Sequence, residues 1–168
     1  MIDLAFDKKD VQEVSRKVDK SELSQLYGML SEKNDKIRYP AFLILQSRSQ
    51  QTCDVYPFFD SLCLKLKSEN SYHRSIGLML IAENARWDKE NKLEAVFGDY
   101  IALLNDEKPI TVRQCIESLG IIAEYKPGLR AKIGVALGSF DILKVRETMQ
   151  KSIKQDIEHV MKVINMKK

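Results

Sequence analysis

Side chains suited to acid–base or metal chemistry are few and scattered in this sequence. Histidine occurs only at His73 and His159, and neither has a cysteine or carboxylate at the spacing of a metal site. Of the three cysteines, Cys53 and Cys63 lack a metal-binding spacing, and Cys115 falls on an apolar helical pattern as a small core residue. No nucleophile stands near a base. We therefore predict no catalytic residue, no metal and no cofactor.

The glycines do not form a phosphate-binding loop, because neither a GxGxxG nor a GK[ST] motif is present. Four of them fall inside predicted helices: Gly77 and Gly120 on the core side of two inner helices, and Gly98 and Gly134 on outer helices. A glycine there costs about 1 kcal/mol relative to alanine. We expect each of the four to allow a neighbouring helix to approach closely.

Three arginines recur at similar spacing, each between a polar turn and an apolar helical segment. They are Arg38, Arg74 and Arg113, 36 and 39 residues apart (74 − 38 and 113 − 74), and a weaker copy follows at Arg146. A period of about 20 to 50 residues with two helices per period is typical of a helical solenoid. The turns before the three arginines contain Asp35, Asn70 and Asp106, in that order.

This pattern resembles the HEAT repeat, whose motif is a polar Asp/Asn turn, a Val/Ile–Arg step and an apolar helix. The matching residues are Asp35 with Ile37 and Arg38, and Asp106 with Val112 and Arg113, whereas the copy Asn70, His73 and Arg74 departs at its first two positions. The resemblance covers roughly residues 21–150. It implies an all-α, right-handed α–α superhelix of about four helix pairs, with terminal capping helices and with the inner helices along a concave face.

Apolar periodicity places these helix pairs in one domain over residues 1–168. The predicted repeats are about 21–50, 55–86, 91–125 and 128–166 after an N-terminal cap at 1–20, and the predicted inner helices are about 37–49, 72–84 and 109–125. All four prolines, at positions 40, 57, 109 and 127, fall near predicted helix starts.

The last predicted helix runs from Asp141 to about Met166 without glycine or proline. We interpret it as a C-terminal cap on the last repeat. A break near Ser152 into two helices is an alternative, and so is a docking face for a partner or for a second copy of the chain, which would make a homodimer.

The recurring Arg38, Arg74 and Arg113 are interpreted as a structural arginine ladder. Each guanidinium is expected to bond turn carbonyls, or a carboxylate of its own or the next repeat, because its planar fork makes several fixed hydrogen bonds. The alternative is a row of phosphate contacts.

Helical geometry predicts which side chains face the concave side. At about 100° per residue, offsets +1, +5, +8 and +12 from each arginine share one face. The resulting strip holds a single charge, so it favours a protein or peptide partner over phosphate. Its residues are Tyr39, Leu43, Gln46, Gln50, Ser75, Met79, Ala82, Arg86, Gln114, Ser118, Ile121 and Tyr125.

The composition is that of a folded chain with mixed charges. Charged residues make up 30% of the chain and the net charge is only +3. No segment approaches the ~20 apolar residues of a membrane span, and the N-terminal MIDLAFDKKD shows no secretory signal. An odd cysteine count without framework spacing suits a reducing cytosol. We therefore expect a cytoplasmic protein without a membrane partner.

The leading hypothesis is a non-catalytic scaffold or interaction module that binds a protein or peptide on the concave face. Nucleic-acid binding through the C-terminal helix is an alternative, because residues 141–168 carry the whole net charge of +3 (seven Lys/Arg minus four Asp/Glu). Trp87 beside Asp88 suggests a second alternative, a DNA glycosylase-type enzyme, since a HEAT-like group of bacterial DNA alkylation glycosylases uses aromatics and an aspartate on its concave face. This chain is shorter than that family and not strongly basic, which favours Trp87 as cover for an inter-repeat joint.

Overall fold

The computed structural model describes residues 2–166, and every regular element in that range is helical. The all-α prediction is therefore confirmed, and no helix of residues 2–166 has the length and apolar character needed to cross a bilayer. The α-helices are α1 (Val11–Lys17), α2 (Leu23–Met29), α3 (Asp35–Gln51), α4 (Phe59–Lys65), α5 (Ser71–Asn84), α6 (Lys92–Ile101), α7 (Pro109–Tyr125), α8 (Arg130–Gly138) and α9 (Glu147–Met166). The 3₁₀ turns between them are η1 (Lys8–Asp10), η2 (Lys20–Glu22), η3 (Cys53–Phe58), η4 (Ala85–Trp87), η5 (Ala102–Asn105), η6 (Pro127–Leu129) and η7 (Ile142–Lys144).

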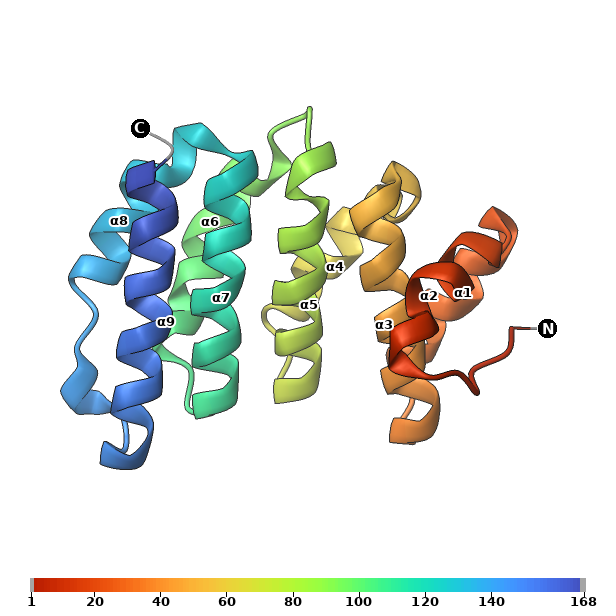
Figure 1. The fold of residues 1–168 in the computed structure, drawn as a ribbon, viewed down its shortest axis with the longest axis horizontal. Helices are drawn as coiled ribbons and strands as arrows, with labels where there is room; N and C mark the ends of the chain where they lie inside the picture. Colours follow the sequence, from red (N-terminus) through yellow and green to blue (C-terminus); the bar gives the residue numbers. More distant parts are fainter. Residues whose placement is uncertain (1, 167–168) are drawn as a thin grey trace.

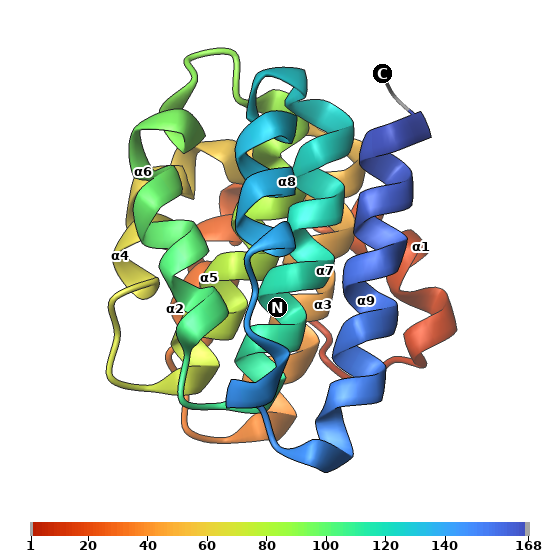
Figure 2. The ribbon, with the colours of Figure 1, turned by 90° about the vertical axis from the view of Figure 1, so that its left-hand side faces the viewer.

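The longer helices α3, α5, α7 and α9 lie side by side in one row, and each contacts the next (Figure 1). The shorter helices α2, α4, α6 and α8 lie behind this row (Figure 2). α1 packs against α3 at the other end of the row from α9. Figure 2 shows that α1 and α9 both stand forward of α3, α5 and α7, so the front of the row is recessed between its two ends.

One continuous cluster of apolar side chains, from Val18 to Ile164, fills the space between the two rows. Tyr100 is fully buried within it, and its hydroxyl donates a hydrogen bond of 2.7 Å to the Leu78 carbonyl, which satisfies the one polar group that this large ring carries inside. Because every helix contributes to the same cluster, the front surface rests on a continuous packed base.

The glycines follow the prediction at two positions and depart from it at two. A Cβ on Gly77 would lie 3.1 Å from the Leu62 carbonyl oxygen, and one on Gly120 would lie 3.2 Å from Val160. Both therefore allow the close helix approach that the sequence predicts. Gly98 and Gly134 have no such neighbour within 4 Å, so the expectation of close approach was wrong for these two.

The three predicted inner helices correspond to α3, α5 and α7, with one difference at Pro40. α3 begins at Asp35, two residues earlier than predicted, because the Asn34 side chain accepts the Lys36 amide and caps the helix. Pro40 therefore lies in the second turn instead of the first.

The last helix begins at Glu147 and not at Asp141. The Asp141 carboxylate caps the separate turn η7, and Val145 is extended with φ −97° and ψ 146°, which ends any continuation. From Glu147 the helix is unbroken through Ser152, and Ile153, Val160 and Ile164 are buried. Their burial, together with the extensive contact between α9 and α7, gives α9 the position of a cap at the end of the row.

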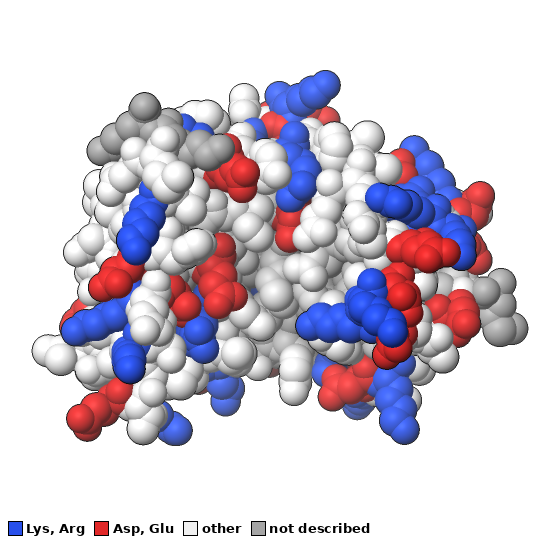
Figure 3. Space-filling view, in the orientation of Figure 1, with Lys and Arg blue, Asp and Glu red and all other residues white. Residues whose placement is uncertain are grey.

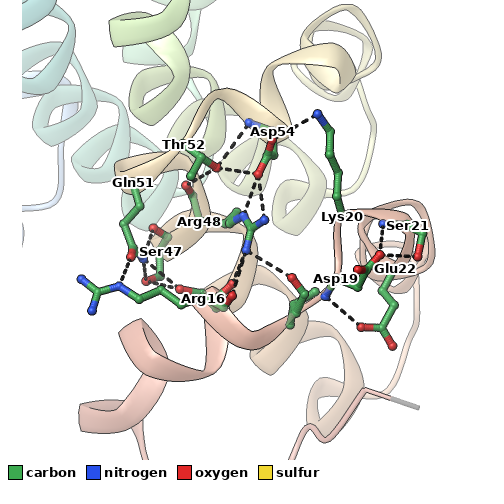
Figure 4. A network of polar contacts seen from close by, with 12 residues as sticks. Arg16, Asp19, Lys20, Ser21, Glu22, Ser47, Arg48, Gln51, Thr52 and Asp54 are labelled. Atoms are coloured by element: carbon green, nitrogen blue, oxygen red, sulfur yellow. Dashed lines mark hydrogen bonds and ion pairs between the residues drawn. The ribbon is translucent and has the colours of Figure 1, made fainter.

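A polar network ties α1 to the C-terminal end of α3 (Figure 4). The Arg48 guanidinium donates to the Ser15 carbonyl at 2.7 Å and to the Asp54 carboxylate at 3.0 and 2.8 Å. Beside it, the Ser15 and Ser47 hydroxyls are 2.9 Å apart, and the Gln51 amide donates to both. The joint between the N-terminal segment and the row therefore combines directional hydrogen bonds with the apolar packing of Val11, Val14 and Val18.

Candidate protein-binding groove

The Arg74 side chain links two successive helices of the row. Its Nε and Nη2 donate to Asp106 at 2.6 and 2.9 Å, and its Nη1 donates to the carbonyls of Ser68 and Glu69 in its own turn. The Asp106 side chain is only 3% exposed, so the pair is shielded from water. Burial tends to raise the pKa of Asp106, but the Arg74 hydrogen bonds and the Lys108 amide lower it below its usual value.

Arg113 repeats this arrangement one helix further along. Its Nε and Nη2 donate to Asp156 of α9 at 2.7 and 3.2 Å. Arg38 does not. It pairs with Asp35 on its own helix, and its guanidinium lies over the Tyr72 ring, 4.1 Å from the ring centroid. Each of the three arginines thus contacts the next helix of the row, but only two do so through a carboxylate.

A groove of about 400 Å³ opens on the front of the row, where the N-terminal halves of α3, α5 and α7 meet. Three of its apolar side chains are strongly exposed: Tyr39 at 49%, Tyr72 at 57% and Ile110 at 57%. We call it the α3–α5–α7 groove. Its lining residues are Asp35, Arg38, Tyr39, Phe42, Ser71, Tyr72, Ser75, Ile76, Met79, Lys108, Ile110 and Gln114.

One residue of the groove lining, Gln114, carries a polar atom without a partner in the described part of the chain. The Gln114 Oε1 atom is buried, and no donor within residues 2–166 reaches it. A buried unpaired acceptor costs about 1–3 kcal/mol.

The predicted concave strip is only partly on the surface. Four of its members line the groove: Tyr39, Ser75, Met79 and Gln114. The structure buries four of them: Leu43 is 9% exposed, Ser75 7%, Ser118 3% and Ala82 0%. Adjacent helices of the row cover these positions, so the expectation that Leu43, Ala82 and Ser118 face a partner was wrong.

The remaining strip residues lie toward the other end of the row helices. Arg86 donates to both the Glu83 carboxylate and the Gln50 carbonyl, and its guanidinium lies 4.4 Å from the Tyr125 ring centroid. The Gln50 amide also donates to Glu83 at 2.9 Å. These side chains satisfy one another. Gln46 and Ile121 are half-buried and lie outside the groove.

The sequence interpretation missed two principal groove residues, Tyr72 and Ile110. They precede Arg74 by two positions and Arg113 by three. At about 100° per residue, offsets of −2 and −3 fall at about 160° and 60°, which is about 20° to either side of the sector of about 80–140° that the strip offsets +1, +5, +8 and +12 occupy. Extending the same face back by one turn would have found both.

Asp88 and Trp87 are engaged in structural contacts. Asp88 Oδ1 accepts from the Tyr56 hydroxyl at 2.6 Å and from the Lys92 amide, Oδ2 accepts from the Leu93 amide, and Lys126 lies 3.1 Å away. Burial tends to raise the pKa of Asp88, but these hydrogen bonds lower it below its usual value. Trp87 donates to the Ser49 carbonyl at 2.6 Å. The pair joins α3, η3 and α6, in keeping with the expected cover of a joint.

Charge is unevenly distributed over the front face. Its middle is predominantly uncharged, and charged side chains gather toward both ends (Figure 3). The outward side of α9 carries both signs of charge in equal number, through the exposed Glu147, Lys151, Lys154 and Glu158. In residues 2–166 no three His, Cys, Asp or Glu side chains are grouped as metal ligands would be.

Comparisons of the chain with protein-family models, with curated proteins and with solved structures gave no significant match. The α3–α5–α7 groove must therefore be interpreted from its own chemistry.

Proposed function

We propose that this chain is a non-catalytic protein-interaction module, built as a right-handed HEAT-like solenoid of four helix pairs, which binds a protein or peptide segment in the α3–α5–α7 groove. The two rows of helices and the recurring arginine contacts support the solenoid. The exposed apolar side chains of the α3–α5–α7 groove support protein or peptide binding.

The observation that carries the proposal is the exposure of Tyr39, Tyr72 and Ile110 around one apolar groove. Large apolar side chains exposed together on a soluble protein mark binding sites more often than single scattered ones do. Tyrosine is also enriched at the energetic centres of protein interfaces, where its ring is buried and its hydroxyl stays hydrated.

The uncharged middle of the front face favours a protein over a nucleic acid. Nucleic-acid binding requires several lysines or arginines placed along a phosphate track. The outward side of α9 instead mixes both signs of charge, and the groove holds two cations, Arg38 and Lys108, and one anion, Asp35.

The test is affinity capture with the full chain and matched surface variants. The double variant Tyr39→Glu/Ile110→Glu places two charges on the groove rim without touching the core, whereas Leu143→Glu changes a side chain that is 81% exposed and outside the groove. We expect the wild type and Leu143→Glu to retain the same proteins from a cell extract and the double variant to lose them. Equal retention by all three, with unchanged helical circular dichroism, would contradict the proposal.

A further inference from the structure

The three polar turns before α3, α5 and α7 share one hydrogen bond, although Asn34 and Asn70 are the N-cap residues of α3 and α5 and Asp106 lies two residues before the N-cap of α7. Asn34, Asn70 and Asp106 each accept the backbone N–H of the residue two positions later, at 3.0, 2.9 and 2.9 Å. They are spaced 36 residues apart (70 − 34 and 106 − 70). Position 70 is therefore the counterpart of position 106.

This equivalence explains why Arg38 differs from Arg74. Asp106 follows its arginine by 32 residues (106 − 74), and Asn70 follows Arg38 by the same distance (70 − 38). The asparagine keeps the turn but has no carboxylate to offer. Arg38 consequently lacks the ion pair between neighbouring helices that Arg74 makes.

Arg38 is a buried cation with a single, exposed counterion. The residue is 7% exposed, and within residues 2–166 its one hydrogen bond goes to Asp35, whose side chain is 70% exposed. An arginine has five N–H donors, and Arg74 uses its own in four hydrogen bonds. Arg38 lines the α3–α5–α7 groove, so a carboxylate that enters the groove can take the place that Asp106 holds beside Arg74.

The neighbouring groove surfaces define the rest of the ligand. Tyr39, Tyr72 and Ile110 offer exposed apolar contact area. The charged lining residues sum to +1 (Arg38 and Lys108 against Asp35), which suits one carboxylate, whereas Asp35 would repel a phosphate dianion.

We propose that the α3–α5–α7 groove recognises a peptide segment in which an aspartate or glutamate side chain stands beside an apolar side chain, with the carboxylate paired to Arg38 and the apolar group between Tyr39, Tyr72 and Ile110. This inference rests on the proposed protein-binding function and adds the chemistry of the partner.

The experiment selects peptides from a displayed random library on the immobilised full chain, with counter-selection on the Tyr39→Glu/Ile110→Glu variant. Enriched sequences are synthesised with acetylated and amidated ends, so that the only carboxylates are side chains. Each is paired with a copy in which the acid is replaced by Gln or Asn, and binding is measured by fluorescence anisotropy. We expect the acidic copy to bind about tenfold or more tightly, as a charge-assisted hydrogen bond predicts.

Two variants then assign the preference to Arg38. Asn70→Asp keeps the helix cap, since both residues cap helices well, and it supplies Arg38 with a carboxylate from within the protein. We therefore expect the acidic peptide to lose most of its affinity advantage over the amide copy. Asp35→Asn removes the competing carboxylate, and we expect tighter binding of the acidic copy. Circular dichroism checks that both variants are folded. A third variant, Arg38→Lys, keeps the positive charge but loses the planar guanidinium, so it should also weaken binding of the acidic copy.

The outcomes separate this inference from the function on which it rests. If no peptide is enriched on the wild type over the counter-selected variant, the groove does not bind peptides and both proposals fail. If peptides bind but the acidic and amide copies have equal affinity, or if Asn70→Asp leaves the preference unchanged, the assignment to Arg38 alone is overturned. A requirement for a free C-terminal carboxylate, or a preference for phosphorylated peptides, would also overturn it.

Discussion

Arg74 and Asp106 form a two-pronged ion pair across neighbouring helices, with N–O distances of 2.6 and 2.9 Å and almost no exposure of the carboxylate. The same carboxylate accepts the Lys108 amide and so shapes the turn that leads into α7. One side chain therefore fixes both a turn and the position of the helix before it.

Removal of this carboxylate should destabilise the fold. Asp106→Asn leaves the Arg74 charge buried without its counterion, and we expect the free energy of unfolding to fall by about 3 kcal/mol. Urea denaturation followed by circular dichroism measures this. The control is Asp99→Asn, which removes a carboxylate from an exposed pair with Lys67 and should change stability by less than about 0.5 kcal/mol. Equal effects of the two substitutions would show that the buried Arg74–Asp106 pair stabilises the fold no more than an exposed pair does.

Stability should fall in acid. The folded-state pKa values of Asp88 and Asp106 lie below the ordinary aspartate value of 3.8, because their hydrogen bonds outweigh burial. A depressed folded pKa contributes stability that is complete above the unfolded pKa and lost as the pH falls through the folded value. We expect the urea midpoint to drop between about pH 5 and pH 3. The Asp106→Asn variant should show a shallower drop, and parallel curves would contradict the assignment.

Alanine substitutions at two mid-helix glycines, Gly98 and Gly77, should change the stability of the protein in opposite directions. Gly98→Ala meets no atom within 4 Å and should stabilise the protein by about 1 kcal/mol through helix propensity. Gly77→Ala places a methyl group 3.1 Å from the Leu62 carbonyl oxygen and should destabilise it by about 1–2 kcal/mol. Thermal unfolding of the two variants distinguishes them, and stabilisation by both would show that α4 and α5 have room to separate.

Loss of Arg48 should loosen α1 before the rest of the protein. Arg48→Gln removes the hydrogen bonds to the Ser15 and Val18 carbonyls and to Asp54 (Figure 4). We expect hydrogen exchange to accelerate in residues 8–22 while α5 and α7 keep their protection. Arg16→Gln is the matched control, because the exposed Arg16 guanidinium donates a single hydrogen bond within residues 2–166, to the Gln51 side chain. Uniform acceleration along the chain would instead indicate global destabilisation.

The sequence located the row helices well because their signals are local. A polar turn, a proline at Pro109 and apolar spacing place the start of α7 where the structure has it. The arginine contacts were also predicted in kind, although not which partner each would take. Local patterns were insufficient at Asp141, where a capping carboxylate closes a short turn and the helix starts six residues later.

The exposed groove was harder to predict, because exposure depends on neighbours that are distant in sequence. Leu43 and Ser118 have the correct helical angle, yet adjacent helices cover them. Tyr72 and Ile110 remain exposed because they lie near the first turns of α5 and α7, where the row is open to solvent. The missing counterion of Arg38 was visible in the sequence as asparagine at position 70, but its meaning required the Arg74–Asp106 contact.

Arg38 contacts an aromatic ring where Arg74 and Arg113 contact a carboxylate, and this difference affects how firmly the helices are joined. Arg74 and Arg113 lock α5 to α7 and α7 to α9 through paired oxygens, whereas Arg38 meets α5 through the flat face of Tyr72. A guanidinium can slide over a ring, and α3 contacts α5 less extensively than α5 contacts α7. The N-terminal part of the α3–α5 joint therefore lacks the ion pair present at the next two joints, while hydrogen bonds of Glu83, Asn84 and Trp87 with α3 hold its other end.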